Sequence, residues 1–233
     1  MADYQLYYWA APFRGQFVRA VLAFAGKSWD EVDDSEIAAL MEGPVAAMPV
    51  PFMGPPLLVD RQAGFAIAEM PAIVLYLGDT LGLLPADAAR RALTIKIVND
   101  ANDVIDEISL DGGRDMWTPS RWEEFKPRLE KWMTIWEETG RRHGLGPGNG
   151  FMLGGETAAI ADVVTATLWT TMIERFSRVR EVFEQTAPMT AALCQRVSAL
   201  PPLAGLAEKT RRDYGEDYCG GQIGASMKRV LDA

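Results

Sequence analysis

The stretch MGPPLLVD, from Met53 to Asp60, places two adjacent prolines directly before a short apolar run that has the composition of a β-strand. Proline has no N–H group, and the interior of a sheet tolerates it poorly. A strand that begins directly after Pro55 and Pro56 therefore needs an explanation from the surrounding sequence.

The sequence on both sides of this stretch alternates between strand-like and helix-like segments. Aromatic residues favour a strand at residues 4–9, and apolar residues at helical spacing favour a helix after it. In chain order we predict a strand at 4–9, a helix at 12–26, a strand at 28–32, a short and poorly capped helix at 35–43, a hairpin of two strands at 56–60 and 65–69, and a helix from 70 that ends near Gly78. This order predicts a small mixed α/β domain over residues 1–84.

The rest of the chain shows no strand-like alternation and is predicted to be helical. Residues 91–108 carry an apolar stripe that begins with Ile95, and residues 120–140 carry an aromatic stripe that we interpret as core. Residues 158–176 are apolar on all sides, which predicts a buried helix. We therefore predict an all-helical bundle domain over residues 91–233.

Composition places the chain among ordinary globular proteins and argues against several classes of function. Of the 233 residues, 48% are hydrophobic and 24% are charged, and the net charge is −9. This acidic balance argues against binding to nucleic acid or to an anionic membrane surface. No signal peptide or spanning segment is visible, and Cys194 and Cys219 are interpreted as free thiols, so a cytoplasmic location is expected. One histidine, His143 in a glycine-rich loop, and two separated cysteines offer too few ligands for a metal site.

Three motifs resemble those of the cytosolic glutathione transferase family, and the resemblance extends over nearly the whole chain. They are GPPLLVD at 54–60, AEMPAIVLYLG at 68–78 and YYWAAPFRGQFVR at 7–19. The last motif resembles the tyrosine-type enzymes, with a distant similarity to the pi and sigma classes and a bacterial appearance. The resemblance implies a thioredoxin-like domain with a mixed four-stranded sheet, followed by the helical bundle. It also implies a cytoplasmic, homodimeric detoxification transferase that uses glutathione as co-substrate and no metal.

The first two motifs imply a glutathione-binding surface. Pro56 matches a cis proline of the family, which makes the preceding residue present its backbone groups to glutathione. Pro55 stands at that preceding position and has no N–H group, so only its carbonyl remains for the ligand. Glu69 matches the residue that meets the γ-glutamyl ammonium, and the N–H group of Met70 at a helix start suits a carboxylate. The family has serine at the position of Met70, so one hydroxyl contact is lost.

The third motif implies the catalytic residue and its neighbours. The alignment places Tyr8 at the catalytic tyrosine, and Tyr7 is the competing choice because strand alternation lets only one of the two face the ligand. A neutral phenol donates a hydrogen bond to the glutathione thiolate and so lowers the thiol pKa. Arg14 matches an arginine near the thiol and counts among the glutathione contacts. Trp9 and Phe13 are expected to help line an apolar acceptor pocket.

The predicted function is therefore activation of the glutathione thiolate for attack on a small hydrophobic electrophile. The alternative is a non-catalytic protein of the same fold that binds a ligand or a partner, because Pro55, Met70 and Ala159 each depart from the family pattern. Ala159 stands where the family has a capping Ser or Thr, and we expect a weaker helix cap there. The C-terminal residues 213–233 either cover the acceptor site or extend beyond it.

Overall fold

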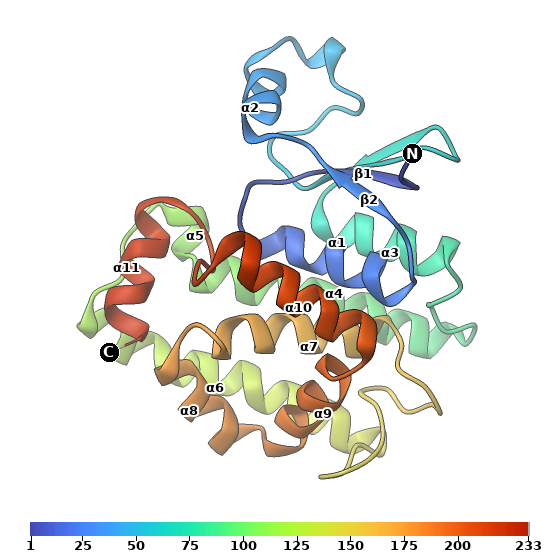
Figure 1. Ribbon diagram of the computed structural model, residues 1–233. Helices are drawn as coiled ribbons and strands as arrows, with labels where there is room; N and C mark the ends of the chain where they lie inside the picture. Colours follow the sequence, from blue (N-terminus) through green and yellow to red (C-terminus); the bar gives the residue numbers. More distant parts are fainter. Residues whose placement is uncertain (233) are drawn as a thin grey trace.

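A four-stranded sheet forms the centre of the N-terminal part of the computed structural model, which describes residues 1–232 (Figure 1). The strand order is β2-β1-β3-β4; β1 pairs with β2 in parallel, whereas β1 with β3 and β3 with β4 are antiparallel. The strands are β1 (Tyr4–Tyr7), β2 (Trp29–Glu31), β3 (Leu57–Asp60) and β4 (Phe65–Ala68). The mixed four-stranded sheet is thus confirmed. Ala233, the last residue of the predicted helical domain, lies outside the described residues.

The helices of this part pack on the sheet and connect its strands. They are α1 (Phe13–Phe24), α2 (Asp34–Glu42), the short 3-10 helix Val45–Ala47 and α3 (Met70–Thr80). Figure 1 shows α1 and α3 on the face of the sheet that is turned toward the helical part.

The expectation of a poor cap on α2 is wrong, because the Asp33 side chain accepts the N–H of Ser35 at 2.9 Å. Helix α3 runs two residues beyond the predicted end at Gly78.

The remaining elements are all helical, as predicted. They are α4 (Ala88–Ile108), α5 (Leu110–Gly113), α6 (Pro119–Arg142), α7 (Ile160–Ile173), α8 (Ser177–Thr186), α9 (Pro188–Ser198), α10 (Pro201–Tyr214) and α11 (Gly221–Leu231). Helix α7 packs against α1, α4, α8 and α9, which explains why its sequence is apolar on all sides (Figure 1). Within residues 1–232, the structure has no helix that is long and apolar enough to span a membrane.

Aromatic side chains fill the core of the helical part. Trp169 of α7 stacks on Phe183 with a centroid distance of 5.0 Å and meets Trp136 of α6 edge to face at 5.4 Å. The aromatic stripe of residues 120–140 therefore faces the core, as expected. The position of Ile95 was predicted wrongly, since its side chain is 39% exposed and Thr94 lies inside instead.

The first turn of α7 is held by a buried carboxylate instead of a capping hydroxyl. Asp162 accepts the N–H of Met152 at 2.7 Å and the N–H of Ala159 at 2.9 Å. Burial raises the pKa of Asp162 to about 6, although these two hydrogen bonds oppose that rise. Ala159 itself makes no side-chain cap, in line with the expected loss at this position.

Candidate active site

Tyr8 follows β1 and lies where the sheet meets the start of α1. Its hydroxyl oxygen accepts the N–H of Arg14 at 3.0 Å, and only 4% of the residue is exposed. Among residues 1–232, the hydroxyl hydrogen has no acceptor. Tyr8 directly follows Tyr7, and the β3 partner of Tyr7 is Leu57, the residue that directly follows Pro56. The tyrosine is therefore a buried residue with an unused donor beside the double proline.

The close approach of α1 to the ring of Tyr8 requires a glycine. A Cβ atom on Gly15 would lie 2.2 Å from Cδ1 of the ring, far inside van der Waals contact. Burial of the phenol raises the pKa of Tyr8 to about 12, although the nearby Arg14 and Arg19 charges oppose that rise. The hydroxyl is therefore neutral at physiological pH and retains a hydrogen that it can donate.

Two arginines flank Tyr8, and they have different partners. Arg14 ion-pairs with Asp106 at 3.0 Å and donates to the Asn102 side chain at 3.3 Å, so its guanidinium is held by α4. Arg19 is only 2% exposed and forms two hydrogen bonds to Glu31 at 2.8 and 3.0 Å. Its Cζ atom lies 5.6 Å from the centroid of the Tyr8 ring.

The sequence prediction assigned a role to Arg14 and none to Arg19. A charged residue among the apolar positions of α1 was the signal that could have revealed it.

The predicted glutathione contacts lie around the start of α3. The Pro55–Pro56 peptide bond is cis, as expected from the motif. Glu69 is exposed and has φ of 74°, a left-handed conformation that is uncommon for a residue with a side chain and that marks functional positions. The N–H of Met70 meets no acceptor among the described residues. The Met70 side chain, in contrast, is completely buried in the core and leaves only its backbone for a ligand.

The other predicted residues lie close to Tyr8 but serve different contacts. Tyr7 is half-buried, and burial together with Glu36 raises its pKa, whereas Arg61 opposes that rise. Trp9 is half-buried, and its carbonyl accepts from Ala11 at 2.7 Å. The ring of Phe13 packs edge to face on Tyr218 at 5.5 Å, which the motifs did not reveal.

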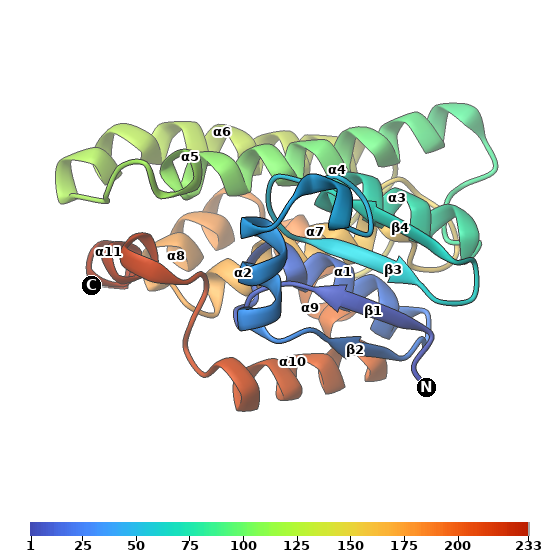
Figure 2. The same cartoon turned by 90° about the horizontal axis from the view of Figure 1, so that it is seen from above.

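The segment between α10 and α11 covers the start of α1. The carbonyl of Tyr218 accepts the N–H of Phe13 at 3.1 Å, and the Tyr218 ring also packs on Phe176 at 5.3 Å. Figure 2 shows how this segment leaves α10 and reaches α11 past the beginning of α1. Of the two alternatives for the C-terminal residues, the structure therefore favours a cover at this end of α1.

A cavity of about 490 Å³ opens beside Tyr8, between the end of β2 and α10. Its lining residues are Tyr8, Ala10, Glu31, Val32, Asp33, Asp34, Lys209, Asp213 and Tyr214. Neither Trp9 nor Phe13 is among them. The cavity wall is thus richer in carboxylates than the apolar pocket that the motifs led us to expect.

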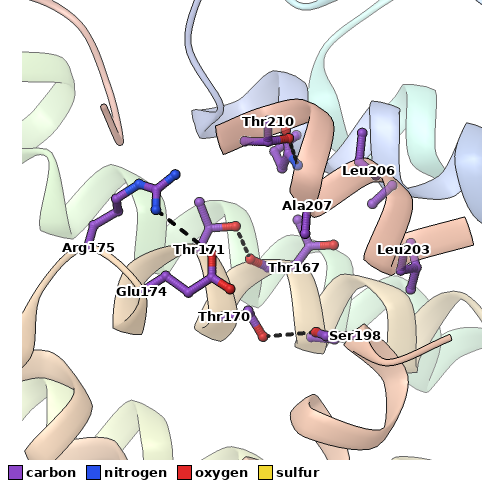
Figure 3. Close-up of a pocket in the computed structure, with 13 residues that line it drawn as sticks. Thr167, Thr170, Thr171, Glu174, Arg175, Ser198, Leu203, Leu206, Ala207 and Thr210 are labelled. Atoms are coloured by element: carbon purple, nitrogen blue, oxygen red, sulfur yellow. Dashed lines mark hydrogen bonds and ion pairs between the residues drawn. The ribbon is translucent and has the colours of Figure 1, made fainter. Parts of the chain in front are cut away.

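A second cavity of about 70 Å³ lies between α7 and α10, and its mixed wall combines alanine and leucine side chains with several hydroxyl groups (Figure 3). Gln16 donates to Thr210 at 2.9 Å, and its Oε1 atom has no partner among the described residues. Thr170 and Ser198 form a hydroxyl pair at 3.2 Å in the same cavity (Figure 3). This volume suits a few water molecules, and none of the predicted site residues lines it.

Neither cysteine is placed for nucleophilic chemistry. Cys194 and Cys219 are both buried free thiols, and burial raises the pKa of each, that of Cys219 to about 12. The part of the chain that the structure describes contains no group of His, Cys, Asp and Glu side chains that could hold a metal ion.

Comparison with known proteins places this geometry in a family. Residues 93–230, which are more than half of the chain, match the family model described as Glutathione S-transferase, C-terminal domain. The chain belongs to the glutathione S-transferase family. No relative is found among the curated proteins.

Several solved structures share the fold at low sequence identity. A Nu-class GST from Haemonchus contortus is 21% identical with a TM-score of 0.70, and the match covers 90% of this chain and 98% of that one. A Pi-class glutathione S-transferase from Onchocerca volvulus is 15% identical with a TM-score of 0.72, covering 94% and 98%. Monomeric Na-GST-3 from Necator americanus is 19% identical with a TM-score of 0.71, covering 89% and 97%. These likenesses establish the thioredoxin-like and helical architecture of the family for this chain.

Proposed function

We propose that this chain is a glutathione transferase in which the Tyr8 hydroxyl activates the glutathione thiol. The observation that carries the proposal is the buried hydroxyl of Tyr8, which accepts from Arg14 and has no acceptor for its hydrogen among the described residues. Tyr8 follows β1, which pairs with the strand that begins directly after the cis Pro55–Pro56 bond. Membership of the family supports glutathione as the co-substrate. A phenol that stays neutral is the form that donates to a thiolate.

The proposed chemistry separates the roles of sulfur and phenol. The glutathione thiol, with an ordinary pKa of about 8.5, loses its proton to solvent, and the Tyr8 hydroxyl then donates to the thiolate. Donation to the charged form lowers the thiol pKa, and a shift of about one to two units stabilises the thiolate by roughly 1.4–2.7 kcal/mol. The thiolate attacks an electrophilic carbon, forming a C–S bond while a leaving group departs or a conjugated acceptor takes up a proton.

The tripeptide would lie along the start of α3. The Pro55 carbonyl accepts from its backbone, the Glu69 carboxylate pairs with the γ-glutamyl ammonium, and the unpaired N–H of Met70 donates to a carboxylate. The left-handed backbone of Glu69 supports this role, because such a conformation at an exposed position needs a reason. Arg14 contributes through the N–H that holds the Tyr8 hydroxyl, since its side chain is engaged by Asp106.

Replacing Tyr8 by phenylalanine tests the mechanism. We expect Tyr8→Phe to lower kcat/KM for an activated chloroarene by about 10–100-fold near neutral pH and to raise the pKa of bound glutathione by one to two units. The thiolate absorbance of the binary complex reports that pKa directly. Tyr7→Phe is the matched control, because it removes the neighbouring hydroxyl and should leave both readings unchanged.

Other outcomes of this test select between the proposals. Equal activity in Tyr8→Phe and the unmodified protein would remove Tyr8 from the mechanism. No heat with glutathione in calorimetry, combined with binding of hydrophobic dyes, would favour the non-catalytic alternative.

We further propose a cytoplasmic homodimer with a role in detoxification. Membership of the family supports this proposal.

A further inference from the structure

The cavity beside Tyr8 carries an unusual charge balance. It is lined by four carboxylates, those of Glu31, Asp33, Asp34 and Asp213, and by one lysine, Lys209. Figure 2 shows α10, which supplies Lys209 and Asp213, running along the β2 edge of the sheet. The cavity therefore lies between the sheet edge and a helix, with acidic groups on both of its sides.

Two of these carboxylates are neutralised within the protein. Glu31 receives two hydrogen bonds from the buried Arg19 guanidinium. Asp213 pairs with Lys209 and with Arg212, at 2.5 and 3.0 Å. These two acids therefore have basic partners, and they add little to the net charge that a molecule in the cavity experiences.

The other two carboxylates have no basic partner. Among residues 1–232, neither Asp33 nor Asp34 forms an ion pair. One oxygen of Asp33 accepts from the hydroxyl and from the N–H of Ser35, and these two hydrogen bonds lower the pKa of Asp33, so the group is charged at neutral pH. One oxygen of Asp34 accepts the N–H of Ala10 at 3.0 Å. Each carboxylate is exposed, accepts hydrogen bonds through one oxygen, and forms no ion pair with any described residue.

Tyr8 forms part of the cavity wall, so the cavity lies next to the proposed catalytic residue. Tyr8 lines the cavity, is 96% buried, and carries a hydroxyl hydrogen without an acceptor among the described residues. Its ring is also fixed by Gly15 and Arg19. Because the proposed function has this hydroxyl donate to the glutathione sulfur, a molecule in the cavity would lie beside the reacting atom.

We propose that the second substrate of this protein is an electrophile that carries a positive charge, such as a quaternary or protonated amine remote from its reactive carbon. This inference rests on the proposed function. Asp33 and Asp34 attract the cationic group into the cavity, while its apolar body meets Val32, Ala10 and the Tyr8 ring. An anionic electrophile is repelled by the same two charges.

The experiment uses three versions of one activated chloroarene with saturating glutathione. They differ only in a substituent on a methylene spacer, which is trimethylammonium, tert-butyl or sulfonate, so that size is nearly constant while charge changes. Each kcat/KM is divided by the uncatalysed rate constant with glutathione, which removes differences in intrinsic reactivity. We expect the cationic version to exceed the neutral one by about 5–10-fold at low ionic strength, the sulfonate to be slowest, and high salt to reduce the spread.

Variants of opposite sign sharpen the test. The double variant Asp33→Asn and Asp34→Asn keeps both hydrogen-bonding oxygens and should reduce the cation-to-neutral ratio to about 1–2. Lys209→Gln removes the basic residue of the cavity wall and should raise that ratio. Glu42→Gln, at the last residue of α2 and outside the cavity, changes the net charge of the protein by one and should leave the ratio unchanged.

Each result decides between the inference and the function beneath it. Conjugation of all three compounds at equal normalised rates would overturn the cationic substrate while leaving the transferase proposal in place. A cation preference that survives in the double variant would also overturn it. If none of the compounds is conjugated at any glutathione concentration, the proposed function itself fails, and this inference fails with it.

Discussion

Helices α1 and α3 both begin beside the candidate active site, yet their first turns are completed in different ways. Neither has a side-chain cap. At α1, the protein itself supplies the acceptors, because the Tyr218 carbonyl takes the N–H of Phe13 and the Tyr8 hydroxyl takes the N–H of Arg14. At α3, the N–H of Met70 has no acceptor within residues 1–232.

The two helix starts therefore differ in whether their backbone N–H groups have acceptors within the protein. The start of α1 is closed by tertiary contacts, so it orients Tyr8 and is not free for an anion. The start of α3 retains an open donor and the positive end of the helix dipole, which suit a carboxylate. One helix start thus positions the proposed catalyst, while the other is left for the proposed ligand.

The largest expected effect comes from a substitution at Gly15, where the start of α1 packs against the Tyr8 ring. Gly15→Ala brings a Cβ atom to 2.2 Å from the buried Tyr8 ring, so either the ring or α1 must move. We expect a loss of about 3 kcal/mol in the free energy of unfolding and at least a tenfold loss of conjugation activity. Urea unfolding and steady-state kinetics measure the two effects.

Gly205 on α10 provides the matched control for this substitution. A Cβ atom there meets nothing within 4 Å, so Gly205→Ala should be neutral or stabilise the protein by about 0.5–1 kcal/mol. A Gly15→Ala variant as stable and active as Gly205→Ala would show that α1 does not fix the Tyr8 ring.

The second largest effect is expected at the start of α3, where this chain has Met70 in place of the serine of the family. Because this side chain is completely buried, Met70→Ser should leave a cavity and cost about 2–3 kcal/mol of unfolding free energy, although it restores a hydroxyl. Met53→Ser makes the same chemical change at a residue that is 90% exposed, and should alter stability by less than about 0.5 kcal/mol. Thermal and urea unfolding compare the two, and tighter glutathione binding in a fully stable Met70→Ser would contradict the buried role.

The smallest expected effect is a loss of folding stability at alkaline pH that comes from the buried Tyr8 hydroxyl. Burial raises the pKa of Tyr8 from 10 to about 12, so between these values the folded chain keeps a proton that the unfolded chain releases. Stability must therefore fall as pH rises through this window, by about 1.4 kcal/mol at pH 11 for this group. Other buried tyrosines act in the same direction. The contribution of Tyr8 is therefore the difference in the pH dependence of the unfolding free energy between the unmodified protein and Tyr8→Phe. An identical pH dependence of both would place the Tyr8 hydroxyl in water.

The motifs predicted the sheet, the helical bundle and the cis proline because each depends on short-range features. Apolar periodicity distinguishes strands from helices, and the cis proline was implied by the resemblance of the contiguous motif at residues 54–60 to the family. The same local logic failed for Ile95 and for the cap of α2, where one position along a helix or one hydrogen bond decides the outcome. Arg19 of α1 escaped notice as a site residue because its partner, Glu31, lies on a different element, strand β2.

The order of residues by itself determined the secondary structure, the family and the choice of Tyr8, Pro55 and Glu69 as candidates, since these follow from periodicity and from contiguous motifs. Only the tertiary structure decided that Tyr218 closes the start of α1, that Met70 turns into the core, and that Asp33 and Asp34 face a cavity with α10. Those contacts join residues from distant parts of the chain, and their partners are set by how helices pack around the sheet. No local pattern encodes that packing.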